Sequence, residues 1–173
     1  ISHVDLQPGG AAPVAPSAIR AETKTFVNNG FADVSEPRAL ALQEIPGIID
    51  DFRKASANAI AAGFDGVEIH GANGYLLEQF LKDGANQRTD EYGGSVGNRA
   101  RLLLEVTAAV KDEIGAERTG VRISPVSPAN AISCSDPQPQ YDYLAEQLDA
   151  LGIVYLHVVE GATGGPRDVS PFD

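Results

Sequence analysis

Residues 66–75 read GVEIHGANGY, a short apolar strand that runs directly into a glycine-rich bend. His70 ends the strand, and Asn73 and Tyr75 follow on the bend, so three hydrogen-bonding side chains gather at the strand's carboxyl end. Parallel α/β proteins place their chemistry at that end. A His and an Asn can hold an oxygen that gains negative charge, and a phenol can give up a proton. The stretch predicts an active site that polarises a carbonyl and protonates beside it.

Apolar patterns on both sides of this stretch predict alternating helices and strands. Helical spacing begins at Pro46 and recurs before Gly115 and Gly152, and a glycine ends each helix. Strands are expected at 67–69, 120–124 and 153–159. Short strands that are apolar throughout and alternate with helices indicate a parallel sheet. No Gly-x-Gly-x-x-Gly follows any of these strands, which disfavours a dinucleotide fold. We expect an α/β protein that is the middle of a (β/α)8 TIM barrel.

The first 45 residues have a different character from the rest of the chain. They are rich in Pro, Gly and Ala and lack a helical period. Asn29-Gly30 lies between two short β-prone runs, which predicts a hairpin with a type I′ turn. No shift of composition marks a domain boundary. We therefore expect one TIM-barrel domain, with a loop and hairpin at 1–45 and βα units at 46–173.

Composition excludes several classes of partner. The 173 residues carry 24 acidic and 13 basic side chains, a formal charge of −11. Nucleic acids and anionic membranes reward clustered Lys and Arg, so neither is expected as a partner. No apolar run approaches the roughly 20 residues of a membrane span. The single Cys134 leaves no internal disulfide, which favours the cytoplasm.

The two ends of the chain look cut. The sequence starts at Ile1, contains no Met and shows no signal-peptide pattern. Residues 169–173 form neither a helix cap nor a tail. We expect a partial sequence of a larger barrel.

Each residue of the predicted site also has a plain structural alternative. His70 could bond a backbone carbonyl, Asn73 could merely shape the turn, and Tyr75 could be a core aromatic. The clustering of the three favours the functional interpretation. Arg122 ends the next strand, where a buried guanidinium needs an anionic or carbonyl partner. That partner could be a cofactor oxygen or an acid inside the barrel.

Four further features carry weaker expectations. Glu68 and His70 share a strand face, a spacing that could bind a metal, but no third ligand is evident and no metal is predicted. Glu68 is better explained by a hydrogen bond inside the barrel. His157 ends the third strand and could face the site. Arginines and acids of the long loop are expected to form ion pairs that stiffen it: Arg88, Asp90, Arg99 and Arg101.

Three stretches of sequence carry a family resemblance. Residues 70–81, HGANGYLLEQFL, are followed by NQRTDEYGGS at 86–95 and NRAR at 98–101. Together they resemble the Old Yellow Enzyme family, most nearly its bacterial ene-reductases of the pentaerythritol tetranitrate, N-ethylmaleimide and morphinone reductase type. Residues 120–125 resemble the family's fifth strand and residues 155–157 its sixth. The chain would therefore supply roughly strands 4 to 6, plus an excursion that carries the hairpin.

The resemblance implies a flavin enzyme. It implies FMN and NAD(P)H as cofactors and a small electrophilic alkene as substrate, an α,β-unsaturated carbonyl or nitro compound. Reduced flavin would pass a hydride to the β-carbon, His70 and Asn73 would hold the substrate oxygen, and Tyr75 would protonate the α-carbon. Arg122 matches an arginine that contacts the flavin, and the hairpin would cover the site. A monomer or a homodimer is expected.

One alternative follows from the length of the chain. Family members are longer, and the missing segments normally bind the flavin phosphate and its other face. An open part of a barrel would expose sheet edges. The alternative is a truncated, catalytically incomplete barrel fragment without stable flavin binding.

Overall fold

Three parallel strands form the central sheet of the computed structural model, which describes residues 1–162 and 165–167. The strands are β5 (Val67–Gly71), β6 (Thr119–Ile123) and β7 (Tyr155–Val158), in the order β5-β6-β7. Both pairs are parallel, which confirms the predicted sheet. The abrupt end that the sequence suggests at 169–173 lies outside the described residues.

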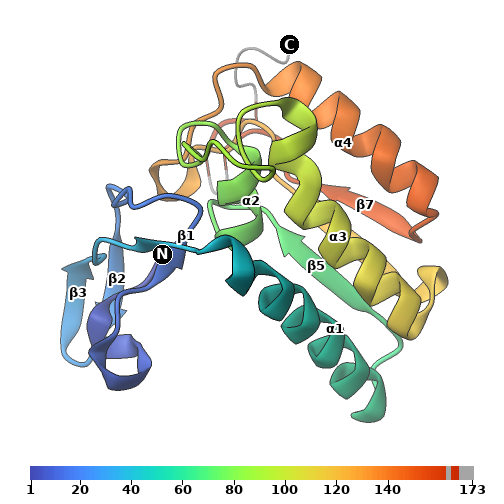
Figure 1. Cartoon of the computed structure of the whole chain (residues 1–173), viewed down its shortest axis with the longest axis horizontal. Coiled ribbons are helices and arrows are strands. Elements are labelled where there is room, and N and C mark those ends of the chain that lie inside the picture. Colours follow the sequence, from blue (N-terminus) through green and yellow to red (C-terminus); the bar gives the residue numbers. More distant parts are fainter. Residues whose placement is uncertain (163–164, 168–173) are drawn as a thin grey trace.

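Three long helices cover one face of this sheet. They are α1 (Ile45–Ala61), α3 (Val96–Ile114) and α4 (Pro137–Leu151), which lie side by side in Figure 1. A short helix, α2 (Leu76–Leu81), follows β5 directly. The order helix, strand, helix, strand, helix, strand agrees with the predicted pattern.

Alternation along the strands puts the core on the helical side. Ile69, Val121 and Ile123 are buried in one apolar cluster with residues of the covering helices. Because successive strand residues point to opposite faces, Glu68, His70 and Arg122 lie on the other face. The helical partners of the core include Leu102, Leu103, Val106, Val110, Leu144 and Leu148.

Local signals at the helix ends explain where two helices start and stop. The Ser95 hydroxyl accepts a hydrogen bond from the Asn98 N–H at 3.3 Å, as expected for an N-cap. Gly152 adopts a left-handed conformation with φ of 70° and ends α4, as its position predicted.

The first 45 residues project to the side of the sheet and its helices (Figure 1). Strands β2 (Lys24–Val27) and β3 (Gly30–Asp33) form the predicted antiparallel hairpin. The prediction of a type I′ turn at Asn29-Gly30 is wrong. Val27 pairs with Gly30, so Asn28 and Asn29 form the turn, and neither has a positive φ. Gly30 already belongs to the returning strand.

Short elements connect these parts. Strands β1 (Val14–Ala15) and β4 (Arg38–Ala39) pair in parallel beside the hairpin. Five 3-10 turns complete the described elements: η1 (Val4–Leu6), η2 (Pro8–Gly10), η3 (Leu42–Glu44), η4 (Ala116–Arg118) and η5 (Ala129–Ala131). Among the described helices, none combines the length and apolarity needed to cross a membrane.

The arrangement is consistent with the predicted partial (β/α)8 barrel. Within residues 1–162 and 165–167, helices cover only the outer face of the sheet, and the inner face carries polar side chains: Glu68, His70, Arg122, Tyr155 and His157. In a closed barrel such a face would line the interior. The numbering of the strands as 4 to 6 remains a prediction.

Candidate active site

His70, Asn73 and Tyr75 come together at the carboxyl end of β5. His70 is the penultimate strand residue, Asn73 lies in the turn that follows, and Tyr75 immediately precedes α2. The rings of His70 and Tyr75 are 5.2 Å apart, centroid to centroid. Tyr75 is 45% exposed, so the alternative of a core aromatic is wrong. The His70 and Tyr75 side chains are thus neighbours, and Asn73 lies between them on the same short stretch of backbone.

The environment of His70 keeps its imidazole neutral. Burial lowers the pKa of His70 below its usual value, and the positive charge of Arg122 lowers it further. The negative charges of Glu78 and Glu68 oppose this shift without reversing it. At neutral pH the ring therefore carries one N–H donor and one lone pair.

Arg122 occupies the matching position on the neighbouring strand. It is paired in register with His70 of β5 and with His157 of β7. Its Nε atom is buried and has no hydrogen-bond partner within residues 1–162 and 165–167. None of the ion pairs of those residues includes Arg122, so the salt-bridge alternative is wrong for the described structure. A buried donor without an acceptor is costly, which points to an acceptor that a ligand would supply.

The turn that carries Asn73 is held by four side chains that the sequence did not single out. Asn73 and Gly74 both have positive φ, 57° and 76°. The Asn73 N–H donates to the Ser124 hydroxyl at 2.8 Å, and its carbonyl accepts from the Asn130 amide at 2.7 Å. The Gly74 N–H donates to the Glu78 carboxylate at 2.6 Å. The Gly74 carbonyl accepts a further side-chain hydrogen bond, from Gln79 at 3.0 Å.

Glu68 and His157 form a pair across the inner face. Nδ1 of His157 lies 3.0 Å from a carboxylate oxygen of Glu68, across the side-chain-free Gly120 of β6. The hydrogen bond expected of Glu68 is thus present, although it is exposed in the described structure, and its place inside a closed barrel stays a prediction. His157 thus lies on the face of the predicted site, but its bond is to Glu68. In the described residues, no three His, Cys, Asp or Glu side chains are grouped to hold a metal ion.

The loop after α2 is stiffened by arginines, only one of which pairs with an acid of the predicted set. Arg88 and Asp90 form an ion pair at 2.5 Å, as predicted. Arg88 also donates to the Leu40 carbonyl at 2.6 Å. Within the described residues, neither Arg99 nor Arg101 forms an ion pair with an acid, so that expectation is wrong there. Both donate mainly to backbone carbonyls, because carbonyls of loops and of helix ends need donors.

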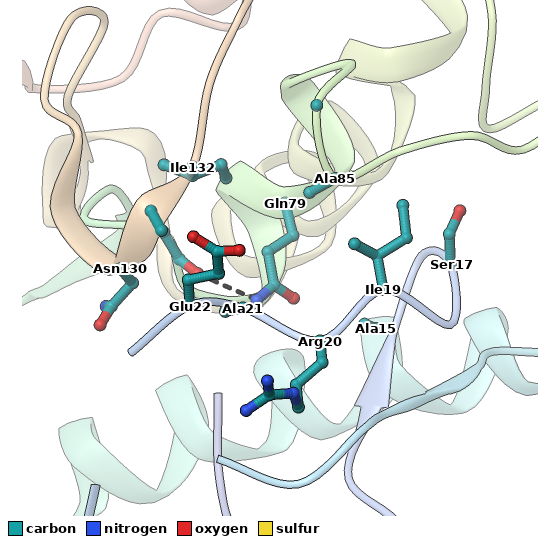
Figure 2. Close-up of a pocket in the computed structure, with 13 residues that line it drawn as sticks. Ala15, Ser17, Ile19, Arg20, Ala21, Glu22, Gln79, Ala85, Asn130 and Ile132 are labelled. Carbon is teal, nitrogen blue, oxygen red and sulfur yellow. Dashed lines mark hydrogen bonds between the residues drawn. The ribbon is translucent and has the colours of Figure 1, made fainter. Parts of the chain in front are cut away.

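A cavity of about 240 Å³ lies next to the turn (Figure 2). Its described lining residues come from the segment before the hairpin, including Arg20 and Glu22, and from the site turn and η5. Gln79 points into this region, and the dashed line in Figure 2 is its bond to Gly74. Oε1 of Gln79 is buried without a partner within the described residues. The described residues that line this cavity do not include the predicted site residues, so the cavity adjoins the site without containing it.

Comparison with known proteins identifies close relatives over nearly the whole chain. The sequence matches the NADH:flavin oxidoreductase / NADH oxidase family over residues 2–170. It is 50% identical to 12-oxophytodienoate reductase 1 of Oryza sativa subsp. japonica over 161 residues, 92% of this chain and 41% of that protein.

Two solved structures show the same fold. Morphinone reductase in complex with tetrahydroNAD is similar with a TM-score of 0.89 and 47% identity, over 91% of this chain and 45% of that one. The Old Yellow Enzyme homologue from Zymomonas mobilis gives a TM-score of 0.84 and 46% identity, over 86% of this chain and 42% of that one. The chain thus spans less than half the length of these relatives.

Proposed function

The chain belongs to the NADH:flavin oxidoreductase / NADH oxidase family, that of the Old Yellow Enzyme, and from this premise we propose that it serves an FMN-dependent ene-reductase. The reaction is reduction of the activated C=C bond of an α,β-unsaturated carbonyl or nitro compound, with NAD(P)H as the electron source. The observation that carries the proposal is that His70, Asn73 and Tyr75 lie at one strand end beside Arg122, whose buried Nε has no partner in the described chain.

The residues present fit a bound flavin. The buried Nε of Arg122 lacks an acceptor in the described chain, and flavin oxygens are acceptors. A guanidinium is always charged and suits an electron-rich ring edge. Arg122 would therefore hold FMN from the inner face of the sheet. When bound, FMN takes a hydride from NAD(P)H and delivers it to the β-carbon of the alkene.

His70 and Asn73 hold the oxygen of the substrate. A neutral His70 has one N–H donor at the end of β5, and the side-chain amide of Asn73, in the turn that follows, also carries N–H donors. Negative charge grows on the carbonyl or nitro oxygen as the double bond is reduced. Donors fixed beforehand at that position stabilise the transition state more than the ground state.

Tyr75 completes the reduction by giving a proton to the α-carbon. Its ring lies beside that of His70, and its partial exposure leaves the phenol on the open inner side. A positioned acid of this kind contributes roughly 10²–10⁴-fold to a rate. The hydroxyl then regains a proton from solvent.

The remaining parts of the proposal concern the surroundings of the site. Residues 1–173 form part of a single TIM-barrel domain, in which the hairpin β2-β3 covers the site. The partner is a small electrophilic alkene, the location is the cytoplasm, and the protein is a monomer or a homodimer. FMN and NAD(P)H are the cofactors.

A direct experiment tests this function. The purified full-length protein is expected to be yellow, to release FMN on denaturation and to oxidise NADPH when cyclohexenone is added. A colourless protein that FMN cannot reconstitute contradicts the proposal.

The second candidate is a catalytically incomplete fragment without stable flavin binding. It is favoured by the open inner face, on which Tyr155 is 46% exposed. An intact mass of the natural protein near 18.1 kDa, without bound flavin, supports this candidate. A much larger mass with bound FMN supports the enzyme.

A further inference from the structure

The site turn has a conformation that needs external support. Asn73 is one of the described non-glycine residues with positive φ, and Gly74 follows it in the same region. Such conformations are sparsely populated and persist only where the surroundings hold them. The direction in which the Asn73 and Tyr75 side chains leave the backbone depends on these two residues. Whatever fixes the turn therefore also places the oxygen clamp and the proton donor.

One buried carboxylate connects both N–H groups of the turn. Oε2 of Glu78 accepts the Gly74 N–H at 2.6 Å. Oε1 accepts the Ser124 hydroxyl at 2.5 Å, and the same hydroxyl oxygen accepts the Asn73 N–H. Glu78 is fully buried, at 0% exposure.

The rest of the Glu78 environment keeps the carboxylate in place. The ammonium of Lys82, also buried, lies 3.2 Å from Oε1 and donates to the carbonyls of Ser124 and Ser127. The Tyr141 hydroxyl donates to Oε1 at 3.2 Å. Burial, together with the negative charge of Glu78, raises the pKa of Tyr141 well above its usual value. The phenol therefore keeps its proton and remains a donor.

The number of hydroxyl protons fixes which groups donate and which accept in this hydrogen-bond network. Ser124 has a single hydroxyl proton, which it donates to Glu78, so its oxygen is left to accept the Asn73 N–H. Glu78 accepts at both oxygens and donates nothing. A carboxylate is thus the one group that lets Ser124 and Gly74 both be oriented as they are. An amide at position 78 would present an N–H to one of these donors.

We propose that Glu78 is a positioning residue of the active site, which acts through Ser124 and Gly74 to fix the turn that carries Asn73 and places Tyr75. The role in catalysis rests on the proposed ene-reductase function. The role in holding the turn does not, since it follows from the hydrogen bonds alone.

The first test measures the turn without any catalytic assay. In the full-length protein, Glu78→Gln is expected to speed amide hydrogen exchange at Asn73 and Gly74 by about tenfold or more. The reason is that the carboxylate which accepts the Gly74 N–H, and which orients the Ser124 hydroxyl toward the Asn73 N–H, is gone. Exchange in β6 should change less. The matched control is Glu105→Gln on α3, whose carboxylate accepts the Tyr92 hydroxyl at 2.8 Å away from the turn. Unchanged exchange at both turn amides overturns the proposal.

The second test measures catalysis by the full-length, FMN-loaded enzyme. Glu78→Gln should lower kcat/KM for cyclohexenone by about 10- to 100-fold, the loss typical of a displaced catalytic group. The FMN content should match that of the wild type, and Glu105→Gln should leave kcat/KM unchanged. In a Tyr75→Phe background, Glu78→Gln should lower kcat/KM by a smaller factor, because the Tyr75 hydroxyl that Glu78 places is already absent. The same factor in both backgrounds contradicts a role through Tyr75.

Ser124→Ala serves if Glu78→Gln does not fold, because it leaves the pair of Glu78 and Lys82 intact. It should speed exchange at Asn73 and leave Gly74 protected, with a smaller loss of kcat/KM than Glu78→Gln. No change at Asn73 rules out the relay through Ser124. If the wild type reduces no alkene while both variants still loosen the turn, the proposed function fails and the positioning inference stands.

Discussion

The two faces of the β5-β6-β7 sheet differ although they alternate along the same strands. On the outer face Ile69, Val121 and Ile123 are buried under helices in one apolar cluster. On the inner face His70 and Arg122 lie in a polar row, and a buried Arg122 donor has no partner among the described residues. One face is satisfied by the chain itself. The other carries a buried donor that no described residue satisfies, and we propose that this face is where the cofactor and substrate bind.

The largest effect is expected on the outer face. Leu103 is fully buried and packs in the core under the sheet. Leu103→Ala should lower the free energy of unfolding by about 2–5 kcal/mol, since it removes apolar burial and leaves a cavity. Denaturant titration of the full-length protein measures this. Leu42→Ala, at a 40% exposed position, is the matched control and should cost far less. Equal losses at the two positions would remove the distinction between core and surface.

Arg122→Gln tests the inner face, where we expect weaker FMN binding and not a less stable fold. FMN affinity should fall by about 10- to 150-fold, the equivalent of a lost charged hydrogen bond of roughly 1.5–3 kcal/mol. The flavin-free protein should lose little stability, because the Nε donor that the substitution removes is buried and has no hydrogen-bond partner in the described chain. Fluorescence titration with FMN and thermal unfolding of the flavin-free form give the two values. A destabilised flavin-free protein with unchanged FMN affinity contradicts this assignment.

Two glycines, one on each face of the sheet, allow the packing of the two faces to be compared by adding a single methyl group. An alanine methyl at Gly71 would lie 3.2 Å from methyl groups of Leu103 and 3.0 Å from the Arg122 carbonyl, in the packed core. At Gly120 it would overlap the ring of Tyr155, which is half exposed and can swing away. Gly71→Ala is expected to cost about 1–3 kcal/mol and Gly120→Ala less. Thermal unfolding of both variants measures the two losses of stability. A larger loss for Gly120→Ala than for Gly71→Ala would contradict the view that the outer face is the more tightly packed of the two.

The smallest effect is an electrostatic one on His70. Its midpoint in an NMR titration should lie below about 6.5, the usual value for His. Since the unfolded chain then binds more protons than the folded one, this group's contribution to stability should fall as the pH drops from about 6.5 toward the folded midpoint. Arg122→Gln should raise the midpoint, though not fully, because burial is the larger cause. A midpoint above the usual value contradicts the assigned neutral ring.

The sequence was sufficient for the sheet, for the long helices and for the placement of His70, Asn73 and Tyr75 at the carboxyl end of β5, for a physical reason. Apolar periodicity reports burial, and a strand that ends in His-Gly-Ala-Asn-Gly marks its own carboxyl end. It was insufficient for the hairpin register, because Asn28-Asn29 and Asn29-Gly30 are both acceptable two-residue turns and pairing along the strands chose between them.

The sequence pattern also did not predict which side chains hold the turn that carries Asn73. Glu78 and Lys82 have the spacing of an exposed helical ion pair, and only the packing of α2 against its neighbours buries them. Ser124 and Asn130 are far along the chain from the turn they hold, so no local signal links them to it.

We propose that Tyr75, at the turn beside the inner face of the sheet, is the proton donor in the reduction of the alkene. Anaerobic stopped-flow measurement on the full-length, FMN-loaded Tyr75→Phe variant separates flavin reduction by NADPH from flavin reoxidation by cyclohexenone. Reoxidation should slow by about 10²-fold or more while flavin reduction stays near the wild-type rate. An equal loss in both half-reactions, or no loss in either, would contradict the assignment of Tyr75.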